Sequence, residues 1–126
     1  MSWWKRLTKP KREAGTEAGA YITLDDFKRI DLRLGLVKTV ETIPRSDKLL
    51  KLTVDIGEER TVVAGLGKHY SPGDLIGKRV VVLANLKPTK LMGIESRGML
   101  LAVGDDKEGL ALITVDREIS HGKRLV

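Results

Sequence analysis

The sequence has no cysteine, few aromatic residues and no long apolar segment. The lack of cysteine among 126 residues excludes disulfides, thiolate metal ligands and cysteine nucleophiles. Aromatic residues make up only 4% of the chain, which disfavours a stacking platform for single-stranded nucleic acid. No apolar run reaches the roughly 18 residues of a membrane-spanning helix, and the N-terminus lacks the apolar core of a signal peptide. We therefore expect a cytoplasmic protein with no membrane partner.

Motifs for catalysis, metal binding and cofactor binding are also missing. His69 and His121 lie far apart and have no cysteine with which to form a metal site. Residues 65–67 (GLG) follow an apolar run, but they lack the third glycine of a dinucleotide-binding loop. Residues 73–78 end in Gly-Lys, but their spacing is too short for a P-loop. We expect no catalytic residue, no metal, no cofactor and no enzymatic activity.

The chain carries a net charge of +6, and residues 1–20 contain five basic and two acidic residues. A basic balance favours nucleic acid or another anionic surface as partner. Residues 1–20 show no sustained hydrophobic period, so we expect a flexible leader before a domain at 21–126. Trp3 and Trp4 in this leader could stack on bases or rest at a lipid interface, but an unstructured tail is the favoured interpretation.

Hydrophobic spacing predicts one short helix followed by several strands. Thr23 is suited to the N-cap of a helix over 23–30, with Leu24, Phe27 and Ile30 on one buried face. From residue 31 the apolar period becomes two and then slips near Gly35, which predicts a bulge in a bent first strand. Further strands are predicted at 50–56, 60–64, 79–84 and 99–103, with a short return strand at 110–115.

This order of elements predicts an all-β protein: a five-stranded OB-fold barrel with a short N-terminal helix and a C-terminal extension. A bent first strand shared by both halves of the barrel, and an insert between strands three and four, are typical of that fold. The insert spans 65–77, where turn residues at 71–74 allow one helical turn. Residues 116–126 are partly apolar and partly basic, and we expect them to dock on the barrel or on a second subunit.

Residues 85–99 (NLKPTKLMGIESRGM) are predicted to form a long loop between the fourth and fifth strands. Three cations of this loop, Lys87, Lys90 and Arg97, face a single acid, Glu95. Spaced cations can meet phosphates while short polar side chains between them fix the register of a polyanion. An ordinary solvated surface loop is the alternative. The binding hypothesis is favoured because the OB fold places its ligand site on this side of the barrel.

Four segments resemble the tRNA-binding domain family: IDLRLGLVKTVE, RSDKLLKLTVDIGE, LIGKRVVVLANLKPTKLMGIESRGMLLAVG and ISHGKRLV. The resemblance covers about residues 21–126, and the NLKPxKxxGxxSxGM run with RSDKL upstream is specific. The family includes stand-alone structure-specific tRNA-binding proteins, C-terminal appendages of methionyl-tRNA synthetase, beta subunits of archaeal synthetases and eukaryotic synthetase cofactors. It therefore implies an OB barrel, tRNA and an aminoacyl-tRNA synthetase as partners, and a homodimer when the domain is free-standing.

The resemblance also implies a set of RNA-binding residues. Lysines would neutralise phosphates, while an amide and a hydroxyl would hydrogen-bond to the RNA backbone or to a splayed base. Met99 is better explained by packing, and Asp47 by orienting Lys48 or the turn. The predicted RNA-binding residues are Arg33, Lys48, Asn85, Lys87, Lys90, Ser96, Arg97 and Met99.

The chain departs from the family pattern at two places. Many relatives carry a basic residue at the position of Met92, whereas Arg45-Ser46 adds a cation where relatives often have asparagine and alanine.

A CsaA-type dimeric peptide-binding chaperone is the alternative on the same barrel, although that group departs from the NLKPxKxxGxxSxGM run. A subunit that docks on a synthetase is a third hypothesis, compatible with the first.

Overall fold

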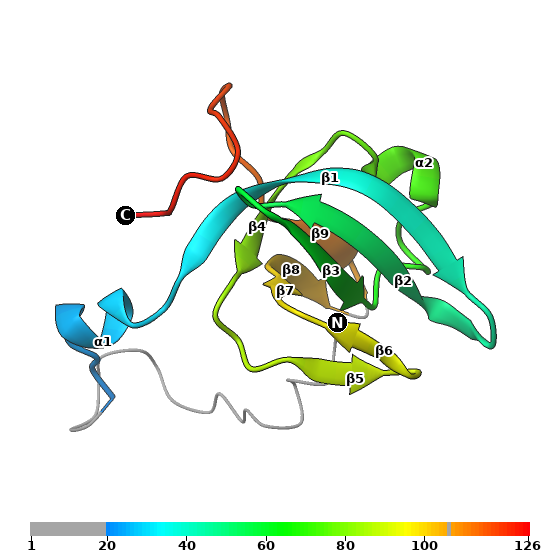
Figure 1. Cartoon of the computed structure of the whole chain (residues 1–126), viewed down its shortest axis with the longest axis horizontal. Coiled ribbons are helices and arrows are strands. Elements are labelled where there is room, and N and C mark those ends of the chain that lie inside the picture. Colours follow the sequence, from blue (N-terminus) through cyan, green and yellow to red (C-terminus); the bar gives the residue numbers. More distant parts are fainter. Residues whose placement is uncertain (1–19, 106) are drawn as a thin grey trace.

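The computed structural model describes residues 20–105 and 107–126 as mostly antiparallel β-structure with short helices (Figure 1). The predicted leader lies outside this part of the chain, apart from Ala20. The main sheet has the strand order β3-β2-β1-β4-β7. Its strands are β1 (Leu32–Ile43), β2 (Ser46–Asp55), β3 (Glu59–Ala64), β4 (Arg79–Leu83) and β7 (Met99–Leu100). The other elements are α1 (Leu24–Lys28), α2 (Pro72–Leu75), β5 (Thr89–Leu91), β6 (Ile94–Ser96), β8 (Ala102–Asp105) and β9 (Gly109–Leu112).

Strand β1 is bent and is shared by two parts of the sheet, as predicted. Its first part pairs with β4 and its second part with β2. The bend needs Gly35, because a Cβ atom there would lie 2.5 Å from Val54 Cγ1. The bulge itself lies further along than expected, since the register with β2 shifts between Val37 and Thr39. Gly35 therefore permits a close approach, and Lys38 is the bulged position.

The core is aliphatic and follows from the alternation of the strands. In β2 the inward positions Leu50, Leu52 and Val54 are buried, whereas the residues between them are half-buried. Each such side chain contributes about 1.5–3 kcal/mol when it is removed from water. The core cluster also includes Val37, Ile56, Val62, Ala64, Leu66, Leu75, Val80, Val82, Ala84 and Leu100.

Strand β3, at one edge of the main sheet, has polar contacts with β6 and with the residue that follows it. The N–H of Arg97 donates to the carbonyl of Thr61 at 2.8 Å, and the N–H of Val63 donates to Ser96 Oγ at 2.9 Å. Among the described strands β3 forms a ladder with β2 alone. The five-stranded antiparallel sheet is confirmed, while its closure into an OB barrel stays a prediction.

The predicted loop at 85–99 contains a hairpin. Strands β5 and β6 pair from Thr89↔Ser96 to Leu91↔Ile94, which leaves Met92 and Gly93 as a two-residue turn. Both turn residues have positive φ, at 51° and 80°, as a type I′ turn requires. The sequence prediction missed the hairpin because Met-Gly is not one of the dipeptides that usually mark this turn.

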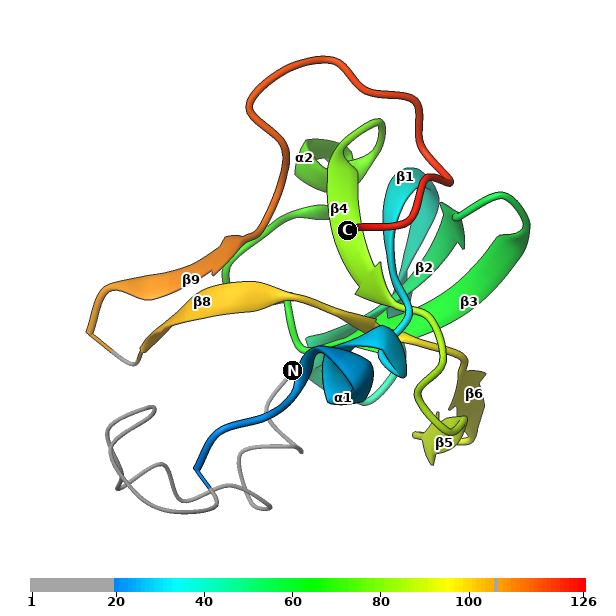
Figure 2. The same ribbon diagram turned by 90° about the vertical axis from the view of Figure 1, so that its left-hand side faces the viewer.

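The predicted fifth strand at 99–103 is divided into two. The N–H of Leu101 still donates to Val81 of β4 at 2.9 Å, but the chain then leaves the main sheet. Strands β8 and β9 pair with each other and project from that sheet (Figure 2). The predicted return strand at 110–115 is thus β9, which ends at Leu112. The helical turn predicted in the insert is confirmed as α2.

Helix α1 begins as predicted but does not bury its apolar face. Thr23 and Asp26 form a reciprocal capping box, with distances of 3.0 and 3.1 Å. Leu24 is nevertheless 68% exposed and Ile30 is 38% exposed. The predicted buried face was wrong because this five-residue helix lies beyond the start of β1, away from the core (Figure 1). Its C-terminal end is held by polar contacts instead, including Arg124 Nη2 to the carbonyl of Lys28 at 2.8 Å.

The C-terminal segment docks on the main sheet, which is one of the two placements predicted. Leu34 of β1 donates to the carbonyl of Lys123 at 2.9 Å and accepts from the N–H of Gly122 at 2.6 Å. The N–H of Leu125 donates to Leu32 at 2.8 Å. His121 adds a side-chain contact, with Nε2 placed 3.2 Å from Asp55 Oδ2. No helix among the described residues is long and apolar enough to cross a membrane.

Candidate nucleic-acid interface

The β5–β6 hairpin presents cations to solvent. Lys90 on β5 lies opposite Glu95 on β6, and both side chains are exposed. Lys87 is exposed in the segment that leads into β5, and Arg97 is exposed just after β6. No ion pair between described residues involves Lys87, Lys90 or Arg97. Their charges are therefore available to an anionic partner.

Ser96 fixes this hairpin to the main sheet. The residue is 5% exposed, and its Oγ accepts from the N–H of Val63 while its hydroxyl donates to the carbonyl of Gly98 at 3.1 Å. Since both hydrogen-bonding capacities are used inside the protein, the side chain acts as an anchor. Removing the hydroxyl would leave a buried backbone N–H unpaired.

Asn85 has its amide engaged within the protein as well. Its Oδ1 accepts from the N–H of Asp31 at 2.9 Å, and its Nδ2 donates to the carbonyl of Arg29 at 2.6 Å. The side chain thus joins the end of β4 to the connection between α1 and β1. Met99 is half-buried in β7 opposite Leu83, which agrees with a packing role.

Lys48 lies at the start of β2, beside the loop that follows β3. Its carbonyl accepts from the N–H of Gly67 at 2.7 Å, and its side chain is exposed. Asp47 pairs with Lys68 at 3.8 Å, so its carboxylate contacts a different lysine from the one expected. The sequence prediction overlooked Lys68 because only the folded chain brings residues 47 and 68 together. Strand β6 contacts β3, which pairs with β2, so the hairpin and Lys48 are connected through β3.

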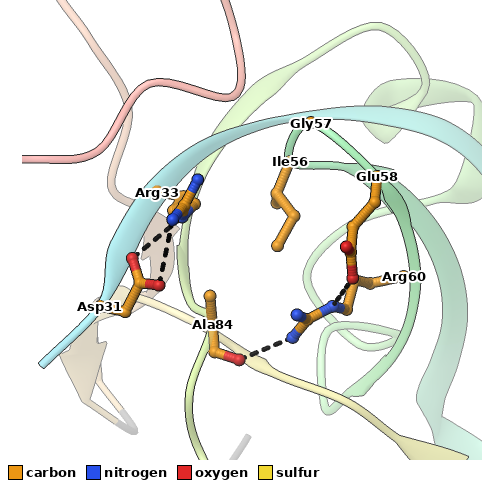
Figure 3. A pocket seen from close by; sticks show the side chains of 7 residues that line it. All are labelled: Asp31, Arg33, Ile56, Gly57, Glu58, Arg60 and Ala84. Carbon is orange, nitrogen blue, oxygen red and sulfur yellow. Dashed lines mark hydrogen bonds and ion pairs between the residues drawn. The ribbon is translucent and has the colours of Figure 1, made fainter.

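Arg33 lies in a pocket of about 230 Å³ rather than on the hairpin (Figure 3). Its Nε and Nη2 donate to the two oxygens of Asp31 at 3.0 and 3.3 Å. The hydrogen bond and the charge of Asp31 raise the pKa of Arg33 above its ordinary value, so the guanidinium stays protonated. Asp31 is also 3.6 Å from Arg124 of the C-terminal segment. The pocket is lined by Asp31, Arg33, Ile56, Gly57, Glu58, Arg60 and Ala84.

Arg60 forms the opposite wall of the pocket and links it to the hairpin. Its Nε donates to Glu58 at 2.9 Å, and its Nη1 donates to the carbonyl of Ala84 at 2.6 Å. The same Nη1 lies 3.4 Å from the carbonyl of Arg97. The sequence prediction missed Arg60, because no spacing in the chain reveals that β3 meets both the end of β4 and the segment after β6.

Comparisons with known proteins agree with this structure. Residues 32–124 match the tRNA_bind family model, described as "Putative tRNA binding domain". The chain belongs to the tRNA-binding domain family. The methionine–tRNA ligase of Thermotoga maritima is 53% identical over 105 residues, which are 82% of this chain and 16% of the ligase. This chain therefore corresponds to a small part of that ligase.

Two solved structures show the same fold as this tRNA-binding domain. The MetRS-related protein of Pyrococcus horikoshii has a TM-score of 0.78 and 40% identity, over 84% of this chain and 98% of that one. The chaperone CsaA of Bacillus anthracis has a TM-score of 0.75 and 27% identity, over 84% and 99% of the two chains. The family match contains every predicted RNA-binding residue, from Arg33 to Met99, whereas α1 and Asp31 precede it.

The charged side chains of the described residues decide what this interface can bind. No group of three or more histidine, aspartate or glutamate side chains among them is arranged to hold a metal ion. The arrangement instead supplies exposed cations, a hairpin anchored to β3 and a pocket lined by paired charges. These features suit the binding of a polyanion, since cations neutralise phosphates and a fixed frame sets their spacing.

Proposed function

We propose that this domain is a non-catalytic, structure-specific tRNA-binding module that recognises tRNA by shape and phosphate contacts. The observation that carries the proposal is the β5–β6 hairpin, which Ser96 anchors to β3 while Lys87, Lys90 and Arg97 remain exposed. An anchored hairpin fixes the backbone positions from which its cations project, so it can favour a phosphate backbone of matching shape. Mobile cations would bind any polyanion equally well.

The proposed interface assigns two kinds of role. Lys48, Lys87, Lys90 and Arg97 contact phosphates, because the side chains of the last three are exposed on or beside the hairpin and that of Lys48 is exposed at the start of β2. Arg33 contributes from the pocket. Asn85, Ser96 and Met99 hold the frame, as their hydrogen bonds and packing indicate. The interface lies on the OB barrel that we infer for the main sheet, a fold in which strands two and three with the adjoining loops bind oligonucleotides.

The module acts in the cytoplasm, either alone or as an accessory to an aminoacyl-tRNA synthetase, with the methionyl enzyme favoured. The identity of 53% to part of a methionine–tRNA ligase supports that choice. Tethering such a module to a catalytic domain raises the effective concentration of tRNA without any new contact at the active site. Copurification of a synthetase with the tagged chain tests this association.

We also propose that the free-standing chain is a homodimer. The resemblance to stand-alone family members supports this, and so do exposed apolar side chains at the N-terminal end of the domain. Tyr21, Ile22 and Leu24 are 72%, 67% and 68% exposed. Light scattering should give twice the mass of the chain, and Leu24→Glu should shift the protein toward the monomer. A monomeric wild-type protein contradicts the proposal.

A filter-binding titration with folded total tRNA at two salt concentrations tests the main proposal. Heat-unfolded tRNA and an unfolded peptide serve as competitors. We expect saturable binding that weakens with salt and prefers folded tRNA, because the hairpin presents fixed cations. Equal competition by unfolded tRNA would contradict recognition by shape.

A peptide-binding chaperone of the CsaA type is the second candidate. The TM-score of 0.75 to a CsaA chaperone favours it. The same titration separates the two functions: the chaperone function predicts that the peptide binds and that folded tRNA has no advantage. The hairpin cations would then serve another purpose.

A further inference from the structure

The pocket between β1 and the β2–β3 turn contains two ion pairs that face each other across an opening (Figure 3). Arg33 and Asp31 form one side, and Arg60 and Glu58 form the other. Ile56 and Ala84 lie between the two pairs in this view. The arginine of each pair lies on a strand of the main sheet, Arg33 on β1 and Arg60 on β3.

The charges of the pocket disfavour a free phosphate. Its four ionisable lining residues are two arginines and two acids, and each guanidinium already pairs with a carboxylate. A phosphate would have to approach Asp31 and Glu58 as closely as the arginines, and the repulsion would offset the attraction. A neutral ligand with both donors and acceptors meets no such opposition. The pocket thus differs in kind from the exposed lysines of the hairpin.

Several polar atoms of the pocket remain available for such a ligand. Arg33 Nη1, Arg60 Nη2 and Glu58 Oε1 make no hydrogen bond with any described residue. They supply donors on both arginines and an acceptor on the glutamate. Guanine matches this set because O6 and N7 accept from arginine, whereas N1–H and N2–H donate to a carboxylate. Adenine, cytosine and uracil lack this combination of two adjacent acceptors and two adjacent donors.

We propose that this pocket is a subsite for one unpaired guanine of a bound RNA. Arg33 or Arg60 donates to O6 and N7, and Glu58 accepts from N1–H and N2–H. The base lies between the two ion pairs, against Ile56 and Ala84. RNA-binding proteins commonly read splayed bases in this way, with guanidinium planes as stacking surfaces.

The position of the pocket connects it to the proposed interface. Arg60 Nη1 contacts Ala84, which precedes the segment carrying Lys87, and lies 3.4 Å from the carbonyl of Arg97. Arg60 thus contacts the backbone on both sides of the hairpin, and we expect one RNA strand to reach the hairpin cations and the pocket together. The subsite rests on the proposed RNA-binding function. It would add a preference for one base to a recognition that otherwise depends on the shape of the RNA.

A nucleotide titration followed by amide NMR tests the subsite on the full chain. The probes are the four 5′-mononucleotides, with ribose 5-phosphate as the control for binding through phosphate. We expect saturable GMP shifts at the amides of Ile56, Gly57, Arg60 and Ala84. AMP, CMP and UMP should bind about tenfold more weakly, which is the effect of one well-formed bidentate pair. Equal shifts from all four nucleotides, or from ribose 5-phosphate, would overturn the proposal.

Glu58→Gln and Glu59→Gln provide a matched pair of variants. Both residues are exposed in the same turn region, and Glu59 does not line the pocket. Glu58→Gln should abolish the preference for GMP, because an amide cannot accept both guanine donors as a carboxylate does. Glu59→Gln should retain it. The same preference in both variants would remove Glu58 from the subsite.

Two further outcomes separate this proposal from the function on which it rests. L-methionine, a zwitterion that also suits paired charges, is titrated in parallel; its binding in place of GMP would overturn the guanine assignment. Total tRNA is measured by filter binding on the same samples. Selective GMP shifts without tRNA binding would support the subsite and contradict the tRNA module. Binding of tRNA without GMP selectivity would support the module and contradict the subsite.

Discussion

The domain contains two hairpins of opposite character, β2–β3 and β5–β6. The first pairs over six positions and carries buried Leu52 and Val62 opposite each other. The second pairs over three positions, has an exposed Lys90–Glu95 pair, and contributes one buried side chain, Ser96. Apolar burial stabilises the first hairpin, whereas a hydroxyl and a few backbone bonds hold the second in place.

The difference shows how a small domain separates stability from binding. Three-residue strands bury too little apolar surface to be stable alone, so β5–β6 depends on its attachment to β3. In return, its outward positions are free of packing constraints and can carry cations. Substitutions should therefore change stability when they affect the first hairpin and binding when they affect the surface of the second.

The largest effect is expected from Leu52→Ala, which breaks the apolar hairpin. Leu52 is fully buried, and its truncation leaves a cavity, so the free energy of unfolding should fall by about 2–5 kcal/mol. Urea denaturation measures this decrease. Lys90→Ala is the comparison on the other hairpin and should stay within about 0.5 kcal/mol of wild type. Equal decreases in the free energy of unfolding of the two variants would contradict the proposed difference between the two hairpins.

Ser96→Ala should release the second hairpin from the sheet. The N–H of Val63 would lose its partner in a buried site, at a cost of about 1–3 kcal/mol. Binding of tRNA should also weaken, because the cations no longer have a fixed spacing. Urea denaturation and filter binding measure the two effects. Reduced stability with unchanged tRNA binding would mean that Ser96 stabilises the hairpin but that tRNA binding does not depend on this anchor.

Met92→Asn should stabilise the second hairpin. Met92 has a φ of 51°, a left-handed conformation that asparagine adopts more readily than methionine. Relief of this strain should raise the free energy of unfolding by about 0.5–1 kcal/mol. Thermal and urea unfolding provide the measurement. A decrease would mean that the side chain of Met92 makes a contribution larger than the backbone strain.

The smallest effect concerns Asp55, at the end of β2. The hydrogen bond from Gly57 N–H, with further help from His121, lowers the pKa of Asp55 below its ordinary value of 3.8. The resulting stabilisation is complete above pH 3.8 and disappears as pH falls through the lowered pKa. Urea midpoints at decreasing pH should therefore fall less steeply for Asp55→Asn than for wild type. Equal slopes for Asp55→Asn and the wild type would contradict this role of Asp55.

The sequence predicted those parts of the fold that depend on local patterns. Alternation located β2, β3 and β4, and Thr23 located the start of α1. The β5–β6 hairpin escaped prediction because its strands are short and Met92-Gly93 is an unusual type I′ turn. The exposed face of α1 also escaped, since periodicity indicates which side of a helix is apolar but not whether a partner covers it.

The candidate site was predictable in its residues more than in their roles. The spacing of Lys87, Lys90 and Arg97 indicated an anionic partner, and these side chains are exposed in the structure. Ser96 and Asn85 also belong to the resemblance, but their hydrogen bonds to Val63 and Arg29 could be seen only in the folded chain. Contacts between distant parts of the chain decide whether a polar side chain faces a ligand or holds the frame.

The most direct test of the account compares two double variants of equal charge. Lys87→Glu/Lys90→Glu alters the hairpin, whereas Lys38→Glu/Lys78→Glu alters exposed lysines elsewhere. Affinity for folded tRNA is measured across a range of salt concentrations. We expect the hairpin variant to bind more weakly, with the log–log salt slope reduced by roughly 0.9 for each duplex phosphate that the protein no longer neutralises. The control should retain most of the affinity and the slope. Equal weakening in both variants would mean that net charge alone attracts tRNA, and would contradict an interface centred on the β5–β6 hairpin.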